Sequence, residues 1–332
     1  MAIKIKSNQI EIGQYYLTDS STGLFFSGKV NAASTLPFVQ GSTKGYASGG
    51  MTFPTPLVNT IDSFPFATNS NATDVGDLTV TRQGGAGQSS TVSGYTSGGL
   101  NTPSTTVNII DKFPFAANAN ATDVGDLTVT GSYLAGQSSD SNGYAAGLIG
   151  INKFPFASNA NASSVGVLTT SSITRAGQSA GSFGYASSIG TPSSPGAAAL
   201  GINKFPFSTD ANATNIGNLT QGRILGTGQS SAVSGYTSGG SNNPPAALLN
   251  IATLDKFPFA TDASASSVGT LTQGRSGQSG QSSLSRGYSS GGVTYPTPQV
   301  NTIDSFPFAS DASATDVGDL TVVRQGVVGQ QV

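Results

Sequence analysis

Short runs of β-branched and aromatic residues alternate along the chain with clusters of Gly, Pro, Asn and Ser. No run repeats its apolar positions at the helical spacing of about 3.6 residues, so the pattern favours strands over helices. Over residues 86–130 it predicts strands at 86–91, 93–98, 107–113 and 124–130. The Pro of a Phe-Pro-Phe triplet cannot donate to a sheet, so it should end the third of these strands.

A repeat orders this pattern from about residue 41 onward. Thirty-one residues separate Phe64, the first Phe of a Phe-Pro-Phe triplet, from Tyr95 of a Gly-Tyr pair, and the same step occurs in five consecutive units. The return step from each Tyr to the next triplet varies between 10 and 21 residues. A fixed step beside a variable one is typical of a repeat that carries a free loop on one side. The repeated residues are Phe64, Phe113, Phe154, Phe205, Phe257 and Phe306, with Tyr46, Tyr95, Tyr144, Tyr185, Tyr236 and Tyr288.

The spacing predicts an all-β fold. Four short strands in a unit of about 49 residues, repeated six times, predict a six-bladed β-propeller of four-stranded antiparallel blades. Both faces of such a blade are apolar, and only stacking against neighbouring blades buries them. The repeated Phe and Tyr residues are therefore predicted to be structural. Each triplet Phe should contribute about 1.5–3 kcal/mol if it is fully buried.

The two ends of the repeat region are predicted to complete one blade. In the other units a Gly-Gln pair such as Gly87-Gln88 precedes the Gly-Tyr pair by a fixed step, and Gly329-Gln330 occupies the same position at the C-terminal end, where no Gly-Tyr pair follows. The unit of Tyr46 has the Gly-Tyr pair but lacks the strand that carries Gly-Gln. We therefore expect residues 326–332 to pair beside Tyr46 and close the ring, which removes an exposed sheet edge. This gives a propeller domain over 41–332.

Three features of the units resemble the kelch repeat. A strand ending in Gly98-Gly99, a strand ending at Asp111, and a step from Leu78 to Arg82 ahead of a small-residue strand match that family's unit. The resemblance covers all six units and implies a propeller. The family's tryptophan is absent and two units break the Gly-Gly pair, so the chain is kelch-like. Sugar oxidases among kelch relatives use Cys, Tyr and His around copper, and the absence of Cys and His excludes that activity.

Composition narrows the function further. Charged residues make up 9% and the net charge is −2, which gives no electrostatic footprint for nucleic acid. Without Cys or His there is no disulfide, no Ser-His-Asp or Cys-His nucleophile, and no ordinary zinc or copper site. No signal peptide and no apolar run of about 18 residues is present, so we expect no membrane insertion and synthesis in a cytoplasm. The sequence predicts neither a cofactor nor a metal.

Residues 1–40 lie outside the repeat and are predicted to form an N-terminal arm with short strands, because Ile3 and Ile5 alternate with Lys4 and Lys6. The opening Met-Ala-Ile-Lys-Ile-Lys-Ser-Asn-Gln-Ile resembles the start of many tailed-phage virion proteins, especially tail and fibre components. The resemblance implies a place in the virion, contact with other virion proteins through the arm, and assembly in several copies. Two roles remain open: an arm that docks into a neighbouring subunit, or one that packs on the propeller.

The variable Tyr-to-Phe loops are the candidate binding surface. They join the second and third strands of each blade and should emerge on one face, where loops on a rigid scaffold commonly bind partners. Met51, Phe53 and Tyr295 stand beside prolines in two of these loops and are the candidate binding residues. The alternative is that the loops are tolerant connectors. They span residues 47–60, 96–109, 145–150, 186–201, 237–253 and 289–302.

Two further sets of polar residues recur. The Asn/Asp-rich turns, such as 68–74, carry too few carboxylates for calcium and are predicted to bond the backbone locally. Asn71, Asn120, Asn161 and Asn212 begin Asn-X-Ser/Thr sequons, which we interpret as by-products of that turn chemistry. The recurring arginines are expected to bond carbonyls or the Asp62-type residues, with a ligand role as the alternative. They are Arg82, Arg223, Arg275 and Arg324.

These observations favour a non-enzymatic phage virion structural protein, such as a tail, baseplate or fibre component. Its loop face would contact another protein or a host-surface glycan. The alternative is a secreted propeller that is polysaccharide-active or lectin-like. Glycosidases need two carboxylates that flank the scissile bond. Glu11 is the single Glu of the chain, and the repeated Asp positions read as structural, so the enzyme is the weaker hypothesis.

Overall fold

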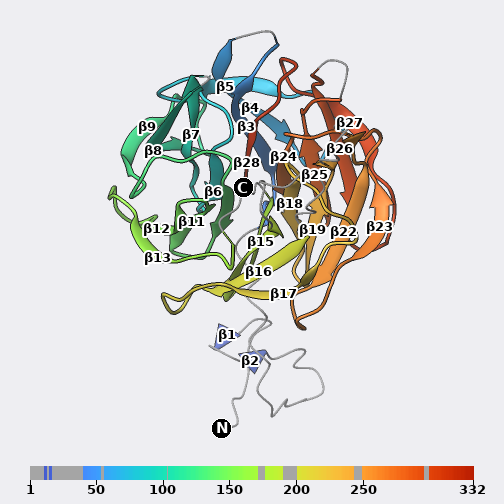
Figure 1. The fold of residues 1–332 in the computed structure, drawn as a ribbon. Helices are drawn as coiled ribbons and strands as arrows, with labels where there is room; N and C mark the ends of the chain where they lie inside the picture. The colour runs from blue at the N-terminus through green and yellow to red at the C-terminus, as the bar shows by residue number, and fades with distance from the viewer. Residues whose placement is uncertain are drawn as a thin grey trace, which may run out of the picture. The chain divides into compact units, whose positions relative to one another are not determined.

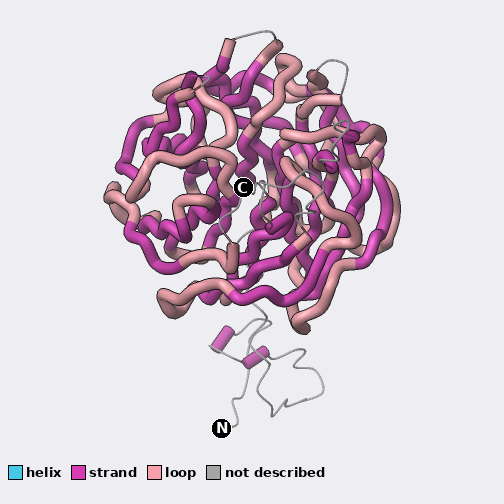
Figure 2. The backbone as a smooth tube through the Cα atoms, viewed as in Figure 1, coloured by secondary structure: helices cyan, strands magenta, loops and turns pink. Residues whose placement is uncertain are grey.

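The computed structural model describes residues 11–12, 15–16, 40–53, 56–102, 104–170, 176–189, 200–242, 249–294 and 299–332. In these ranges every regular element is a strand. Contacts divide the chain into two units, Met1–Pro37 and Phe38–Val332. In the first unit β1 (Glu11–Ile12) pairs antiparallel with β2 (Tyr15–Tyr16). In the second, six four-stranded antiparallel sheets form a ring (Figures 1 and 2), which confirms the predicted six-bladed β-propeller.

Blade 1 is β28-β3-β4-β5, blade 2 is β6-β7-β8-β9, blade 3 is β10-β11-β12-β13, blade 4 is β14-β15-β16-β17, blade 5 is β18-β19-β22-β23 and blade 6 is β24-β25-β26-β27, each written from the innermost strand outward. The innermost strands are β28 (Val328–Gln331), β6 (Ala86–Ser89), β10 (Ala135–Ser138), β14 (Ala176–Ala180), β18 (Thr227–Ser230) and β24 (Ser279–Ser282). The second strands are β3 (Lys44–Met51), β7 (Ser93–Thr102), β11 (Asn142–Gly147), β15 (Phe183–Ile189), β19 (Ser234–Ser238) and β25 (Arg286–Ser290).

The third strands are β4 (Leu57–Pro65), β8 (Thr105–Pro114), β12 (Gly150–Pro155), β16 (Gly201–Pro206), β22 (Thr253–Pro258) and β26 (Thr302–Pro307). The outer strands are β5 (Thr73–Asp77), β9 (Thr122–Asp126), β13 (Ser163–Gly166), β17 (Thr214–Asn218), β23 (Ser266–Thr270) and β27 (Thr315–Asp319). A small ribbon, β20 (Ser241–Asn242) with β21 (Leu249–Asn250), extends the hairpin of blade 5.

The predicted closure is confirmed. β28 pairs antiparallel with β3, with Gln330 opposite Tyr46 and Gln331 opposite Gly45. Figure 1 shows the C-terminal strand β28 beside β3 from the start of the propeller. The backbone carbonyl of Val332 also accepts hydrogen bonds from the N–H groups of Ser42, Thr43 and Lys44.

The strand boundaries predicted for the second unit are partly wrong. β8 ends at Pro114 as expected, but β7 runs on to Thr102 because Gly98 and Gly99 adopt positive φ and form a bulge instead of ending the strand. The outer strand β9 is shorter than predicted and stops at Asp126. Leu127 beyond it turns inward and is buried, with its N–H bonded to Asn108 O.

The triplet phenylalanines have two different roles. The first, such as Phe113, is buried and covers the Gly of its own blade's Gly-Tyr pair. A Cβ on Gly94 would lie 2.3 Å from the Phe113 ring, so this position excludes larger residues. The second Phe is half-buried and stacks on the Tyr of the preceding blade, as Phe115 does on Tyr46 at 4.9 Å between ring centroids. The aromatic rings therefore join neighbouring blades, although the second Phe contributes less burial than we expected.

The buried tyrosines predict sensitivity to alkali. Burial raises the pKa of Tyr46, Tyr95, Tyr144 and Tyr236, and burial with the nearby Asp262 raises that of Tyr185 to about 12. The unfolded value is about 10. The raised pKa therefore contributes stability that is complete below pH ~10 and is lost as the pH rises toward ~12.

We expect unfolding midpoints to hold up to pH ~10 and then fall, with phenolate absorbance appearing together with unfolding. Tyr185→Phe is the matched variant, because the Tyr185 hydroxyl has no hydrogen bond among those seen in the described residues, unlike that of Tyr95, which donates to Phe156 O. Tyr185→Phe should leave the unfolding midpoint at neutral pH nearly unchanged and should reduce its fall above pH ~10. Full titration of all tyrosines in the folded protein near pH 10 would contradict this.

Paired charges lie between the blade linkers and the third strands. Arg82 Nη2 is 2.9 Å from Asp111 Oδ2, and both side chains are at most 1% exposed. Thr79 donates to the same carboxylate through its N–H and its hydroxyl. The prediction that these arginines bond the Asp62-type residues is confirmed. The pairs are Arg82–Asp111, Arg223–Asp255, Arg275–Asp304 and Arg324–Asp62.

Blades 3 and 4 replace this ion pair by a neutral arrangement. In the linker to blade 3, Gly131 stands in the Arg slot, and Asn152 stands in the Asp slot. Asn152 Oδ1 still accepts from Thr128, as the carboxylate does elsewhere. Blade 4 likewise has Asn203 bonded to Thr169. The units that have the Arg therefore have the Asp, and the units that lack the Arg have Asn in place of the Asp. No charged side chain of this set is left buried without its partner.

The Asn-rich turns bond the neighbouring blade as well as their own backbone. Asp74 Oδ1 accepts from Gly76 N–H within its own turn, as predicted. Asn120 Oδ1, however, accepts from the N–H of Asp77 in the preceding blade, and Asn71, Asn161 and Asn212 do the same at other junctions. The sequon asparagines are thus contacts between blades. In the described part of the chain, no group of three or more Asp or Glu side chains is placed to hold a metal ion.

Candidate functional site: the central channel and the hairpin face

The six innermost strands meet at the axis through glycine. A Cβ on Gly136 would lie 2.0 Å from Gly87 O in the preceding blade, and the other five glycines show the same approach at 2.1–2.2 Å. None of these six glycines has a positive φ, so glycine is required here because a Cβ would clash with the neighbouring backbone. The ring consists of Gly87, Gly136, Gly177, Gly228, Gly280 and Gly329.

Gly136→Ala should therefore force two blades apart. We expect destabilisation at the upper end of the range of about 1–3 kcal/mol for overpacking, because the obstructing atom is backbone and cannot rotate away. The denaturant midpoint of the full chain measures it. Gly181→Ala is the control: Gly181 is exposed in the β14–β15 turn and its slot holds Ala232 in blade 5, so we expect less than about 0.5 kcal/mol. Equal effects at the two positions would contradict the tight axis.

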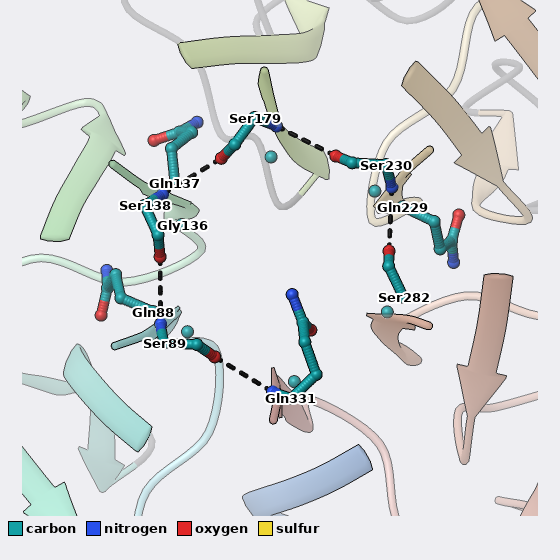
Figure 3. A pocket seen from close by; sticks show the side chains of 15 residues that line it. Gln88, Ser89, Gly136, Gln137, Ser138, Ser179, Gln229, Ser230, Ser282 and Gln331 are labelled. Atoms are coloured by element: carbon teal, nitrogen blue, oxygen red, sulfur yellow. Dashed lines mark hydrogen bonds between the residues drawn. The ribbon is translucent and has the colours of Figure 1, made fainter. Parts of the chain in front are cut away.

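The glutamine after each of these glycines points away from the axis, as Gln88, Gln137 and Gln229 do in Figure 3. Gln88 Nε2 donates to Tyr144 O in the next blade at 2.9 Å, and Gln330 Nε2 reaches Tyr95 O across the closure at 2.9 Å. The repeated Gly-Gln pair was visible in the sequence, but its function as an inter-blade clamp was not predicted.

Serine hydroxyls encircle one mouth of the channel. Ser89 N–H donates to Ser138 Oγ, and the same bond steps from blade to blade as far as Ser282, at 2.9–3.1 Å. In blade 1, Gln331 occupies the serine slot, donates its N–H to Ser89 Oγ and points its side chain into the space within the ring (Figure 3). The cavity lined by these residues is open to solvent and has a volume of about 60 Å³. Each hydroxyl caps an N–H that an innermost strand would otherwise leave unpaired.

Backbone hydrogen bonds join neighbouring blades at the other mouth, where the linkers are described. Gly84 N–H donates to Gly326 O, Gly326 N–H to Gly277 O, and Gly277 N–H to Leu225 O, at 2.7–2.9 Å. Tyr133 continues the ring by donating to Gly84 O. Tyr133 and Leu225 have φ of 56° in a slot that holds Gly84, Gly277 and Gly326 in three other units. At both mouths hydrogen bonds between described residues thus join neighbouring blades, and neither cavity is lined by an acid or a base.

The Tyr-to-Phe hairpins lie at this second mouth. The second strands of the blades begin beside the serines of the innermost strands and run to the opposite end, where the hairpins begin. Phe53 is 78% exposed at the tip of the blade 1 hairpin. Met51 is half-buried: it pairs with Gln325, and its Sδ accepts from Gln83 Nε2. Tyr295, the third candidate, lies outside the described residues. The structure thus places Phe53 on the surface and Met51 in a contact between a hairpin and a linker.

The hairpins themselves carry no charge, and the acids at the adjoining ends of the outer strands, Asp77, Asp126 and Asp319, are half-buried. The six Tyr-to-Phe loops contain no Asp, Glu, Lys or Arg. In the adjoining linkers, the described arginines are the four buried in ion pairs. Exposed pairs such as Lys256–Asp311 lie at the opposite end of the strands.

The chain enters the propeller on the serine-ring side. Gly41 N–H donates to Ser282 O, and Gln40 Nε2 donates to Ser230 O at 2.9 Å. Gln40 and Gly41, the first described residues of the propeller unit, therefore lie at the mouth opposite the hairpins.

Comparison of the sequence with protein-family models gives no match, and comparison with curated proteins also gives none. No helix in the described residues is long and apolar enough to span a bilayer.

Proposed function

We propose that this chain is a non-enzymatic structural and binding protein of a phage virion, a tail, baseplate or fibre component. The arm at 1–40 holds it in the particle, and the hairpin face contacts a second virion protein or a host-surface glycan. The virion part of the proposal rests on the resemblance of the first ten residues to tail and fibre proteins.

One observation carries the binding part: the uncharged hairpin face and the point of chain entry lie at opposite mouths of a closed ring. A protein anchored through its N-terminal segment would leave this face free. The buried contacts between blades keep the hairpins on a rigid base, which suits contact surfaces made of loops.

The alternative, a polysaccharide-active enzyme, has less support. The buried carboxylates of the described residues are Asp62, Asp111, Asp255 and Asp304, and each is bonded to an Arg and a Thr. A glycosidase would need an acid pair facing a substrate. Glycan cleavage by the purified protein, abolished by a single Asp→Asn change, would favour the enzyme.

Mass spectrometry of purified virions tests the proposal, with the chain expected among the particle proteins. A variant lacking residues 1–40 should keep the propeller's melting temperature and be missing from particles. Absence of the intact chain from virions would overturn the virion role. Incorporation of the truncated variant at the normal level would overturn the anchoring role of the arm.

A further inference from the structure

We propose that the axial cavity at the serine mouth, the end of the channel where the serine hydroxyls lie, binds one monovalent anion of halide size. Its ligands are backbone N–H groups of the axial glycines and the hydroxyls of the serines that follow them. Gly87, Ser89 and Gln331 line this cavity together with equivalent residues of the other blades. The site goes beyond the proposed contact function and is independent of it, because the hairpins lie at the other mouth.

The axial glycines direct their N–H groups to the free edge of each innermost strand. In an antiparallel ladder, residues two apart present their N–H and C=O groups to the same edge. Ser89 N–H bonds Ser138 Oγ of the next blade, so it points to the edge of β6 that has no paired strand. Gly87, two residues earlier, presents its N–H to the same edge. The same register places the other five glycines alike: Gly136, Gly177, Gly228, Gly280 and Gly329.

These six N–H groups have no hydrogen-bond partner among the described residues, whereas the glycine carbonyls are partly engaged. A Cβ on Gly136 would lie 2.0 Å from Gly87 O, so the Cα hydrogen in its place points at that oxygen. This weak Cα–H···O contact repeats around the ring. Backbone N–H groups inside a fold are rarely left without a partner, so the donors are the groups that require a ligand here.

Five serine hydroxyls supply further donors above the glycines. Each Oγ accepts one backbone N–H, and its own hydrogen donates to none of the described residues. The five side chains are only 3–6% exposed. A hydroxyl hydrogen rotates to suit its acceptor, so each of them can turn toward a ligand in the cavity that these side chains line. The serines are Ser89, Ser138, Ser179, Ser230 and Ser282.

The lining of the cavity selects the class of ligand. It contains no Asp, Glu, Lys or Arg and no apolar side chain. Converging backbone N–H groups form anion sites, whereas a hard cation needs several oxygen ligands turned toward it. Here the glycine carbonyls face the neighbouring Cα atoms instead. The volume of about 60 Å³ holds one small anion with a few water molecules.

Gln331 differs from its equivalents in the other blades and provides a matched pair of variants. Its side chain points into the space within the ring, where the other innermost strands carry Ser (Figure 3). Gln331→Glu keeps the size of the side chain and places a negative charge at the cavity, which should repel an anion. Gln331→Ser completes the set of serines and should retain it. Both variants keep the backbone hydrogen bond from residue 331 to Ser89 Oγ.

Anomalous scattering from crystals of the full chain locates the ligand. Crystals grown without halide and soaked in sodium bromide should show a bromide peak on the axis, between the glycine N–H groups and the serine hydroxyls. The peak should remain in Gln331→Ser and be absent from Gln331→Glu. A parallel soak in rubidium acetate should give no rubidium peak in the cavity.

Thermal unfolding measures the same binding in solution. Sodium bromide should raise the melting temperature by about 2–4 °C relative to sodium methanesulfonate of equal ionic strength, because a ligand that binds only the closed ring stabilises it. Methanesulfonate is the control for salt, since it is too large for the cavity. The rise should persist in Gln331→Ser and fall below about 1 °C in Gln331→Glu.

Three outcomes would overturn the site. A rubidium peak in place of bromide would make the cavity a cation site. Neither peak would show that water satisfies the N–H groups. A bromide peak that survives Gln331→Glu, with no bromide effect on melting, would identify an adventitious ion only. None of these results bears on the virion role, which mass spectrometry of particles tests separately.

Discussion

Deleting residues 326–332 is expected to abolish cooperative folding of the propeller. The segment contains β28, the innermost strand of blade 1, and the buried side chains of Val327 and Val328. Burial of these two alone contributes about 3–6 kcal/mol, against a typical total stability of about 5–15 kcal/mol. The deletion also removes Gly329 from the axis and the Gln330 clamp to Tyr95.

Thermal unfolding of the truncated chain, followed by circular dichroism, measures the effect. Deletion of residues 1–7, which belong to the other unit, is the length-matched control and should leave the propeller's transition in place. Adding a synthetic peptide of residues 326–332 should restore part of the transition, because β28 is joined to the rest of blade 1 through its pairing with β3. An unchanged melting temperature after the C-terminal deletion would refute the closure.

Arg223→Met is expected to destabilise the protein by about 3–5 kcal/mol, the usual cost of leaving one member of a buried ion pair alone. Arg223 Nη2 lies 2.9 Å from Asp255 Oδ2, and neither side chain is exposed. Burial lowers the pKa of the Arg223 guanidinium, while the charge of Asp255 opposes that shift. Asp255→Asn alone should cost a similar amount, because the guanidinium then stays buried without its counter-charge.

The double variant R223M/D255N should recover most of this loss. It reproduces the neutral state of blade 3, where an Asn accepts the two threonine hydrogen bonds. We expect a coupling free energy of at least about 2 kcal/mol in the double-mutant cycle from denaturant unfolding. Additive losses would show that the two charges are stabilised independently, contrary to the pairing in the structure.

The sequence predicted the architecture because the repeat fixes it at many points at once. Phe64 and Tyr95 recur at an invariant step of thirty-one residues, which holds the outer strand, the linker and the innermost strand between them to a constant length. The step from Tyr95 to Phe113 varies between units because it contains the hairpin, and Gly94 nevertheless lies opposite Phe113 in the β7–β8 ladder. The Arg–Asp contact was also predictable, because both residues recur and a buried charge requires a partner.

Other features depend on the closed ring and could not be predicted from one unit. The serine of five innermost strands reads as a generic polar residue until the neighbouring strand is placed beside it, where Ser138 Oγ accepts from Ser89 N–H. The positive φ of Tyr133 and Leu225 could not be predicted from these residues themselves. Only their alignment with glycines such as Gly277 in other units indicates it. The hairpins vary in length, so the contact between Phe53 and Gln299 was not predictable either.

The separation of Arg82 from Asp111 along the chain has a consequence for how such a gene can change. Units this alike can recombine unequally with one another. A crossover between an Asp and the following Arg, for example between 255 and 275, keeps every acid with its base. A crossover inside a hairpin can join the Arg of one unit to the Asn of another, or a unit without the Arg to one with the Asp. Either product leaves one charge buried without its partner. Gain or loss of whole units should therefore leave breakpoints in the stretch from the triplet to the arginine.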